Sequence, residues 1–370
     1  MVAVCTVALS IVGFLTTSSA QDRKGGIVTG RVLNARTSEP VENVNIFLAN
    51  TTIGTSSDKN GRFTISHIPV GSYDLVFSSV GFDRISQVAR IVRNDSIFLT
   101  MGLQPHDVQF GEVEVSSVRA DEWIHNLKTF KDAFIGKGRY SDKCVILNPH
   151  VLEFSFDKKT DSLVAYTDSI IHIKNVALGY FLHIALEDFR WDVRSEAGHY
   201  LFHLYFEEMI PHSRQESSLW AENRKLANEG SLKQFLWGLY RGKVTEDQFS
   251  MFTGPKVELV QGQSHRVDAQ DFESEQLEDL PLKWITFPEY LRVEGGKFAS
   301  TLVRNEWVEY HSEVSLLHAK ESNVLVDSLG NLFDPLALEI SGAWSRYRVS
   351  ELLPKGMMGS PQDSMHPINK

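Results

Sequence analysis

Apolar and polar side chains alternate in short runs over the first third of the chain. The runs cover residues 27–33, 44–48, 63–65, 73–77, 85–92 and 97–99. Glycine, proline and asparagine separate them at intervals of roughly ten residues, which is the spacing of short strands joined by turns. The pattern predicts an antiparallel β-sandwich or barrel over residues 27–103.

One of the separating segments, Asp58-Lys59-Asn60-Gly61, predicts a tight hairpin turn. Asp and Asn side chains cap backbone amides in such turns, and Gly61 allows a positive φ. The same four residues also resemble the first positions of a calcium-binding loop. The glutamate and the flanking helices of an EF-hand are missing, so the turn is favoured. Gly71 and Gly81 mark two further turns.

A different pattern begins at Asp121. Four apolar side chains recur there at the spacing of one helix face, which are Trp123, Leu127, Phe130 and Phe134. This pattern predicts an amphipathic helix that ends at Gly136 and Gly138.

The remaining chain alternates between strand and helix patterns. Strands are predicted at residues 152–156, 163–166, 171–173 and 200–206, and residues 180–189 form an apolar-rich stretch. Helices are predicted at 220–227 and after a cap at Ser231. Further strands are predicted at 284–287, 290–293, 313–317, 324–326 and 336–340. This order indicates an α+β domain over residues 121–355. Residues 104–120 form the predicted linker, and we expect residues 356–370 to be a mobile tail.

The first 20 residues contain no charged side chain, and an apolar stretch within them ends in small residues. Ser18 and Ala20 occupy the −3 and −1 positions of a cut before Gln21. This layout predicts a secretory signal peptide at residues 1–20, the alternative being a buried N-terminal strand or helix. No other run is long enough to span a bilayer, so we expect an exported protein without a transmembrane span.

The chain has 370 residues and a formal net charge of −10. This charge argues against nucleic-acid binding and against a polybasic membrane surface, because both require a basic face. The cysteines are Cys5, in the predicted signal peptide, and Cys144. A disulfide scaffold is therefore excluded, and we interpret Cys144 as a small buried apolar residue.

An ordered series of motifs lies within residues 27–103. It consists of Ile27-x-x-Gly30-x-Val32, Glu39-Pro40-Val41-x-x-Val44, Gly54-Thr55-x-x-Asp58-x-Asn60-Gly61-x-Phe63, Gly71-x-Tyr73 and Val80-Gly81-Phe82. This series resembles the carboxypeptidase-regulatory-like domain, a seven-stranded, transthyretin-like (prealbumin-like) sandwich. The resemblance implies an accessory module without catalytic residues of its own. In that family it lies beside the catalytic unit of some metallocarboxypeptidases, or ahead of the plug and barrel of outer-membrane transporters.

A second set of motifs lies in the following domain. It comprises Phe134-x-Gly136, Leu147-Asn148-Pro149, Asn175-x-x-Leu178-Gly179-Tyr180, Trp220-x-x-x-Arg224 and Gly230-Ser231-Leu232. These motifs resemble the partner domain of uncharacterised bacterial envelope proteins that also begin with the sandwich, the carboxypeptidase-like regulatory domain-containing proteins. That resemblance implies a place in the periplasm or outer membrane of a Gram-negative cell and no activity. The amphipathic helices of residues 121–355 argue against the transporter barrel.

Two segments have part of the spacing of a zinc carboxypeptidase site. They are His150-Val151-Leu152-Glu153 and His318-Ala319-Lys320-Glu321, and the second is followed by His366 as a distant histidine. Strand residues three apart face opposite sides of a sheet, which argues against the first segment. Too little chain follows Glu321 to hold the catalytic domain. We therefore expect no catalytic, cofactor or metal site.

Three other groups could take part in binding. His199 and His203 are four apart, but they lie in a predicted strand. An acidic loop, residues 268–279, could hold calcium and is more simply solvated. Six tryptophans could stack on sugars, and their periodicity favours burial instead. The loop residues are Asp268, Asp271, Glu273, Glu275, Glu278 and Asp279, and the tryptophans are Trp191, Trp220, Trp237, Trp284, Trp307 and Trp344.

The sequence therefore predicts an exported, non-enzymatic cell-envelope protein that binds a partner protein. A sandwich edge can recruit a partner strand, and Val113-x-Val115 is one segment that could pair in this way. The first alternative is a carbohydrate- or peptide-binding protein with a cleft in residues 121–355. A metal-dependent hydrolase that uses His318 or Glu321 is the third hypothesis.

Overall fold

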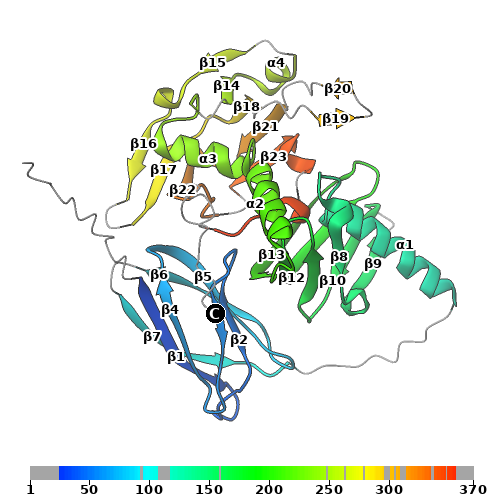
Figure 1. Ribbon diagram of the computed structural model, residues 1–370, viewed down its shortest axis with the longest axis vertical. Helices are drawn as coiled ribbons and strands as arrows, with labels where there is room; N and C mark the ends of the chain where they lie inside the picture. Colours follow the sequence, from blue (N-terminus) through cyan, green and yellow to red (C-terminus); the bar gives the residue numbers. More distant parts are fainter. Residues whose placement is uncertain are drawn as a thin grey trace, which may run out of the picture.

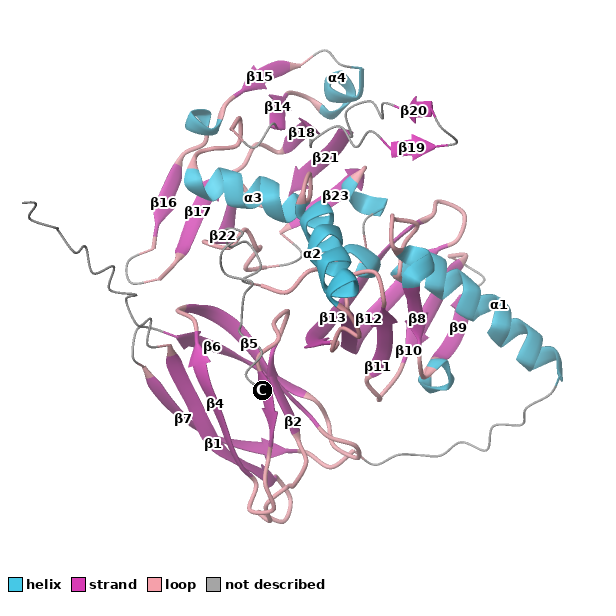
Figure 2. Ribbon diagram, viewed as in Figure 1, coloured by secondary structure: helices cyan, strands magenta, loops and turns pink. Residues whose placement is uncertain are grey.

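The computed structural model describes residues 25–91, 95–106, 117–157, 160–246, 249–261, 264–277, 280–295, 301–303, 306–308, 314–334, 337–346 and 348–355. The predicted signal peptide, the predicted tail and the segment of Val113 and Val115 lie outside these residues. The described chain is mostly β structure in several sheets, with helices between them (Figure 1 and Figure 2).

Seven strands form two facing sheets in the N-terminal part. They are β1 (Gly26–Asn34), β2 (Asn45–Leu48), β3 (Gly54–Ser56), β4 (Arg62–Ile68), β5 (Gly71–Ser78), β6 (Ile85–Ile91) and β7 (Ser96–Leu103). One sheet has the order β4-β1-β7 and the other β3-β2-β5-β6. Apolar residues of alternating positions fill the space between the sheets, among them Val28, Val32, Phe63 and Phe77. The six strands predicted here are confirmed, and β3 was missed because Gly54-Thr55-Ser56 contains no apolar side chain.

The prediction of a wholly antiparallel sandwich is wrong at one pair of strands. β7 runs parallel to β1, from Ile27 opposite Ser96 to Asn34 opposite Leu103. The chain leaves β6 in one sheet and enters β7 in the other, so β7 is not a hairpin partner of β1. The two strands approach closely at Gly30, where a Cβ would collide with the carbonyl oxygen of Leu99.

The chain then forms a helix and a six-stranded antiparallel sheet. The elements are α1 (Ser117–Phe134), β8 (Cys144–Ile146), β9 (Glu153–Asp157), β10 (Ser162–Tyr166), β11 (Ile171–Asn175), β12 (Tyr180–Asp192) and β13 (Ala197–Glu208). The strand order is β8-β11-β12-β10-β9, and β13 also pairs with β12. Helix α1 begins four residues before the predicted start at Asp121.

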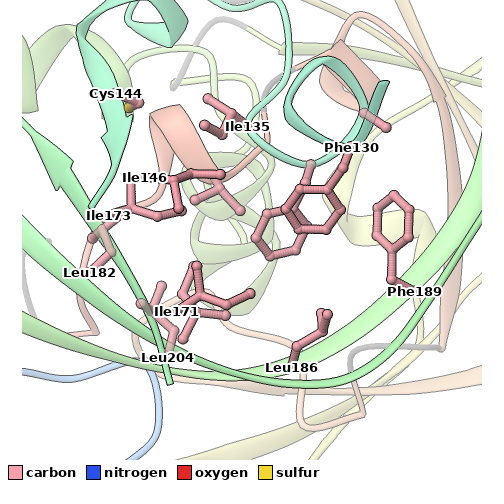
Figure 3. Close-up of a cluster of buried hydrophobic side chains, with 14 of the residues drawn as sticks. Phe130, Ile135, Cys144, Ile146, Ile171, Ile173, Leu182, Leu186, Phe189 and Leu204 are labelled. Carbon is pink, nitrogen blue, oxygen red and sulfur yellow. The ribbon is translucent and has the colours of Figure 1, made fainter. Parts of the chain in front are cut away.

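Helix α1 covers one face of this sheet. Phe130 and Phe134 lie on its inner side and stack on each other, with ring centroids 4.9 Å apart. Figure 3 shows Phe130 opposite Phe189 of β12, with Ile146, Ile171 and Ile173 beside them. These side chains are buried, so the helical spacing of the aromatic residues creates the first large core of this part.

A second core lies further along the chain. Its helices are α3 (Leu232–Arg241) and α4 (Lys256–Gln261). Its strands are β14 (Phe249–Thr253), β15 (His265–Val267), β16 (Ser274–Gln276), β17 (Leu282–Thr286), β18 (Tyr290–Gly295), β19 (Thr301–Val303), β20 (Glu306–Val308), β21 (Val314–Ala319), β22 (Asn323–Asp327) and β23 (Leu338–Gly342). The sheets have the orders β15-β14-β18-β21-β23, β16-β17-β22 and β19-β20. Phe235 and Leu239 of α3 pack against Phe249, Leu291 and Leu317. The helix that precedes α3, α2 (Arg214–Asn228), lies against the first core, where Ala227 packs and Trp220 Nε1 donates to the Val176 carbonyl at 3.0 Å.

Local chemistry explains where two elements after the sandwich begin, α3 and β12. Ser231 Oγ accepts a hydrogen bond from the Gln234 amide at 3.1 Å, which caps α3 as predicted. Before β12 the chain turns at Gly179, which has a φ of +70° and where a Cβ would collide with the Trp220 ring. The residues predicted as an acidic loop contain a short strand, β16, which pairs with β17.

Candidate functional site

The sandwich is joined to β13 by backbone hydrogen bonds from the loop between β2 and β3. The Asn50 amide donates to the Leu204 carbonyl at 2.6 Å, and the Phe206 amide donates to the Thr51 carbonyl at 2.9 Å. Thr51 and Tyr205 thus form an isolated parallel bridge. These bonds attach the sheet of β2 and β5 to the long β12–β13 hairpin.

Side chains fill the space beside this bridge. Phe47, Ala49 and Val76 are buried against Tyr205, and the rings of Phe47 and Tyr205 have centroids 5.6 Å apart. Arg84 adds a polar contact, since its Nη1 donates to Glu187 Oε1 at 2.8 Å. The outer side of the β2–β5 sheet is therefore occupied by the rest of the chain.

The C-terminal segment reaches the same junction. The Lys355 amide donates to the Asn50 carbonyl at 2.7 Å, and Lys233 Nζ donates to the Pro354 carbonyl at 2.9 Å. Burial lowers the pKa of Lys233 to about 8, which the charge of Asp327 partly opposes. The half-buried ammonium group of Lys233 thus fixes the C-terminal segment through its hydrogen bond to Pro354.

The other sheet of the sandwich, β4-β1-β7, has an open outer face. Its inward-pointing residues belong to the sandwich core, whereas Ile27 and Phe98 point outward and are 40% and 70% exposed. Figure 1 shows β1 and β7 on the side of the sandwich away from β12 and β13. An exposed phenylalanine on a strand that faces away from the junction marks a surface available to another molecule.

The edge of this sheet is β7. It pairs with β1 along one side, and no strand pairs with its other side among the residues that the structure covers. Its sequence, SIFLTMGL, contains no charge and no proline. Among the other edge strands of the sandwich, β4 and β6 each carry an arginine, Arg62 and Arg90, and β3 is only three residues long. Charge and proline are the usual protections of a free edge, and β7 has neither.

The predicted burial of Cys144 is confirmed. Its side chain is 5% exposed in the core under α1. Burial raises the pKa of this thiol to about 12, so it is protonated at neutral pH.

The two candidate zinc segments are not assembled into sites. His150 lies in a 3₁₀ turn (Pro149–Val151), and Glu153 begins β9. His318 Nδ1 contacts Glu339 Oε2 at 3.1 Å, and its ring stacks on Tyr290, so its partner is not Glu321. This hydrogen bond lowers the pKa of Glu339. His366 lies outside the described residues.

The remaining candidates are also placed by the structure. His199 and His203 lie in β13 as predicted, with His199 Nε2 2.7 Å from Asp188 Oδ2. Burial of tryptophan is confirmed for Trp191, Trp220 and Trp344. It is wrong for Trp284, which alternates to the outer face of β17 and is 38% exposed. Trp237 lies under the guanidinium of Arg241, at 3.2 Å from the ring centroid.

Of the acidic loop, Asp271 is used locally: its Oδ2 accepts a hydrogen bond from the Asp268 amide at 2.7 Å. Glu278, Asp279 and the side chain of Trp307 are outside the described part. Across the described ranges, no group of three His, Cys, Asp or Glu side chains is placed to hold a metal ion.

Two hollows in the described part of the chain can be compared with a ligand cleft. One, of about 20 Å³, lies at the junction between Tyr73, Asp327 and Lys355, and is large enough for one water molecule. The other is an open depression of about 410 Å³ on α2, around Leu219. Neither is an enclosed cleft of the kind that holds a sugar or peptide. None of the helices described is long and apolar enough to cross a membrane.

The sequence pattern of the CarboxypepD_reg-like domain matches residues 28–115, which confirms the resemblance seen in the motifs. No curated protein matches the chain. Solved structures match weakly. A type II cohesin–X-dockerin complex from Acetivibrio cellulolyticus is 15% identical over 28% of this chain and 74% of that chain, with a TM-score of 0.19.

Two Bacteroides proteins are similarly distant. A candidate carbohydrate-binding protein from Bacteroides uniformis is 9% identical, covering 44% of this chain and 60% of that chain at a TM-score of 0.19. A candidate membrane-associated protein of unknown function from Bacteroides fragilis is 8% identical, covering 84% of this chain and 99% of that chain at a TM-score of 0.19. Structural similarity at this level supports no conclusion about the fold or the function of this chain.

Proposed function

We propose that this chain is an exported, non-enzymatic cell-envelope protein whose N-terminal sandwich binds a partner protein. The sandwich is a CarboxypepD_reg-like module by its sequence pattern. In this proposal the α+β domain of residues 121–355 anchors the sandwich and leaves one of its sheets free. The envelope location rests on the signal-peptide pattern of residues 1–20.

The observation that supports this proposal is the unprotected edge of β7. Its free side offers backbone amides and carbonyls over eight residues, Ser96–Leu103. An extended partner segment can add to such an edge through main-chain hydrogen bonds and gain specificity from side chains on the outer face. Phe98 is the exposed anchor on that face.

The junction supports the same assignment of faces. The β2–β5 sheet is covered by Tyr205 and its neighbours, so that sheet has no free surface at this point. The β4-β1-β7 sheet lies on the other side of the sandwich core, and within the described residues its outer face is exposed at Ile27 and Phe98. A partner would thus contact β7 without disturbing the junction.

The test is affinity purification from gently solubilised native envelopes, followed by mass spectrometry. Phe98→Lys places a charge on the exposed outer face next to the free edge. Ser66→Lys, on the exposed face of β4 in the same sheet, is the matched control for added charge. We expect the original protein and Ser66→Lys to retain one stoichiometric envelope partner, and Phe98→Lys to lose it.

A partner that is retained equally by all three proteins would contradict the β7 assignment. A protein that purifies alone in every case would contradict partner binding itself. The export part of the proposal has a separate test, which is the N-terminal sequence of the mature protein. A chain that begins at Gln21 is expected, and one that begins at Met1 would contradict export by this signal.

A further inference from the structure

A pair of histidines lies on the outer face of the six-stranded sheet. His172 of β11 and His183 of β12 are directly opposite each other across the strands. Their neighbours Ile171, Ile173, Leu182 and Ile184 are buried on the other face, under α1. Alternation along both strands therefore places the two imidazoles together on the face away from that core.

The two rings approach each other through the same atom. Nδ1 of His172 lies 2.8 Å from Nδ1 of His183, and the ring planes are inclined by 81°. The backbone of His172 is fixed by its amide, which donates to Asn148 Oδ1 at 2.8 Å. The His183 side chain is 24% exposed, so solvent and ions reach the pair.

A carboxylate determines where His183 carries its proton. Glu207 Oε2 lies 2.8 Å from Nε2 of His183. An ionised carboxylate only accepts hydrogen bonds, so Nε2 of His183 is the protonated nitrogen. The lone pair of its Nδ1 therefore points at His172. This is the arrangement found around metal-bound histidines, where a carboxylate accepts a hydrogen bond from the ring nitrogen that does not bind the metal.

We propose that His172 and His183 form a two-histidine binding site for a divalent transition-metal ion such as Cu²⁺ or Zn²⁺. The two Nδ1 atoms are the protein ligands, Glu207 orients His183, and water fills the remaining positions. Without the ion, the Nδ1–H of His172 donates to Nδ1 of His183. When the ion binds, His172 takes the tautomer protonated on Nε2, so its Nδ1 lone pair becomes free and no net proton is released.

Binding of the ion requires the two side chains to move apart and to turn. Two imidazole nitrogens bound to one tetrahedral zinc ion lie about 3.3 Å apart. The observed 2.8 Å therefore has to widen by about half an ångström, and both rings have to turn so that their Nδ1 lone pairs converge on the ion instead of on each other. Imidazole pairs favour copper, zinc and nickel over calcium and magnesium, which prefer oxygen ligands.

The site lies beside the contact that holds the sandwich. Tyr205 is directly opposite His183 on β13, with ring centroids 5.7 Å apart, and Tyr205 packs against Phe47. A bound ion would thus tie β11 to β12 next to the junction.

The test uses purified protein without a histidine tag. Isothermal titration calorimetry measures binding of Cu²⁺ and Zn²⁺, with Ca²⁺ as the negative control. His172→Gln and His183→Gln are each expected to weaken Cu²⁺ binding at least tenfold. Glu207→Gln is expected to weaken it about tenfold, as loss of an orienting carboxylate does elsewhere. His199→Gln, an exposed histidine of the same hairpin, is the matched control and is expected to bind like the original protein.

Electron paramagnetic resonance of the Cu²⁺ complex provides a second readout, which reports the ligands directly and not the affinity. Hyperfine coupling to two imidazole nitrogens is expected, and to one after either histidine is replaced. The proposal is overturned if the original protein binds neither ion, or if a double variant with both His172→Gln and His183→Gln binds as well as His199→Gln. In either case the two histidines are only hydrogen-bonded to each other and do not form a metal site.

Discussion

At the residue scale, buried polar side chains fix segments that are distant in the sequence. Asn175 is 1% exposed at the end of β11. Its Oδ1 accepts from the amides of Ala177 and Leu178, and its Nδ2 donates to the Ser350 carbonyl at 2.9 Å. One side chain thus shapes the turn into β12 and holds the C-terminal segment.

Asn175→Ala is expected to lower the free energy of unfolding by about 3 kcal/mol, because it leaves buried backbone groups without partners. Urea unfolding monitored by circular dichroism measures this. Asn45→Ala, at an exposed position in β2, serves as the control and should change stability by less than about 0.5 kcal/mol. Equal effects of the two substitutions would contradict the role given to Asn175.

A second residue-scale prediction concerns His203 on β13. Burial lowers its pKa, an effect that Glu187 and Asp74 oppose and Arg84 reinforces. In the unfolded chain its pKa returns to about 6.5, so below that pH the unfolded state binds more protons than the folded state. The free energy of unfolding is therefore expected to fall as the pH is lowered from about 7 towards 5.

Replacement by glutamine, which is polar but does not titrate, is expected to make this fall smaller. Urea unfolding of the original protein and His203→Gln at several pH values gives the comparison. Identical pH dependences for the two proteins would show that His203 does not contribute.

At the element scale, α3 depends on its first turn. Besides the Ser231 cap, Gln234 Oε1 accepts from the Gly230 amide at 2.7 Å, so the two side chains satisfy two backbone donors. Phe235 and Leu239 can then pack into the second core.

Ser231→Ala is expected to lower the free energy of unfolding by about 1 kcal/mol, because the amide of Gln234 loses its partner. Ser231→Asn retains a capping oxygen and should remain close to the original protein. Thermal and urea unfolding of the three proteins measure the difference. No loss in the alanine variant would mean that the cap does not stabilise α3.

Elements with a clear pattern were predicted from the sequence, and those without one were not. The aromatic face of α1 and the alternation of β5 or β13 are set by side chains that repeat at a fixed spacing. β15 and β16 are short and largely exposed, so their sequences show no alternation of buried apolar and exposed polar residues. The parallel direction of β7 depends on where the chain crosses between sheets, which local alternation does not encode.

At the scale of the whole molecule, the junction couples the sandwich to the rest of the chain. Tyr205 contributes both its backbone bridge to Thr51 and its ring contact with Phe47. Arg84 and Lys355 add hydrogen bonds from two other segments. We therefore expect the described parts to unfold together.

Tyr205→Ala is expected to lower the free energy of unfolding by about 2 kcal/mol and to separate one calorimetric transition into two. Tyr166→Ala, which truncates a half-exposed tyrosine at the end of β10, is the control and should keep a single transition. Differential scanning calorimetry distinguishes the cases. Two transitions in the unmodified protein would contradict the coupling.

The two surface features proposed here were only partly accessible from the sequence. The lack of charge in residues 96–103 is visible in the sequence, but that β7 is an edge strand depends on the pairing of β1 with β4 and β7. His172 and His183 are eleven residues apart, and only the register of β11 against β12 brings their rings together. A metal motif that is defined by spacing along the sequence therefore does not include this pair.

Binding of a partner protein at the free edge of β7 is the proposal on which the assigned function depends. Hydrogen–deuterium exchange of the purified protein with and without its captured envelope partner tests it most directly. We expect the amides of residues 96–103 to become protected in the complex, while the junction around Tyr205 is unchanged. Protection confined to other surfaces, with residues 96–103 exchanging as in the free protein, would contradict it.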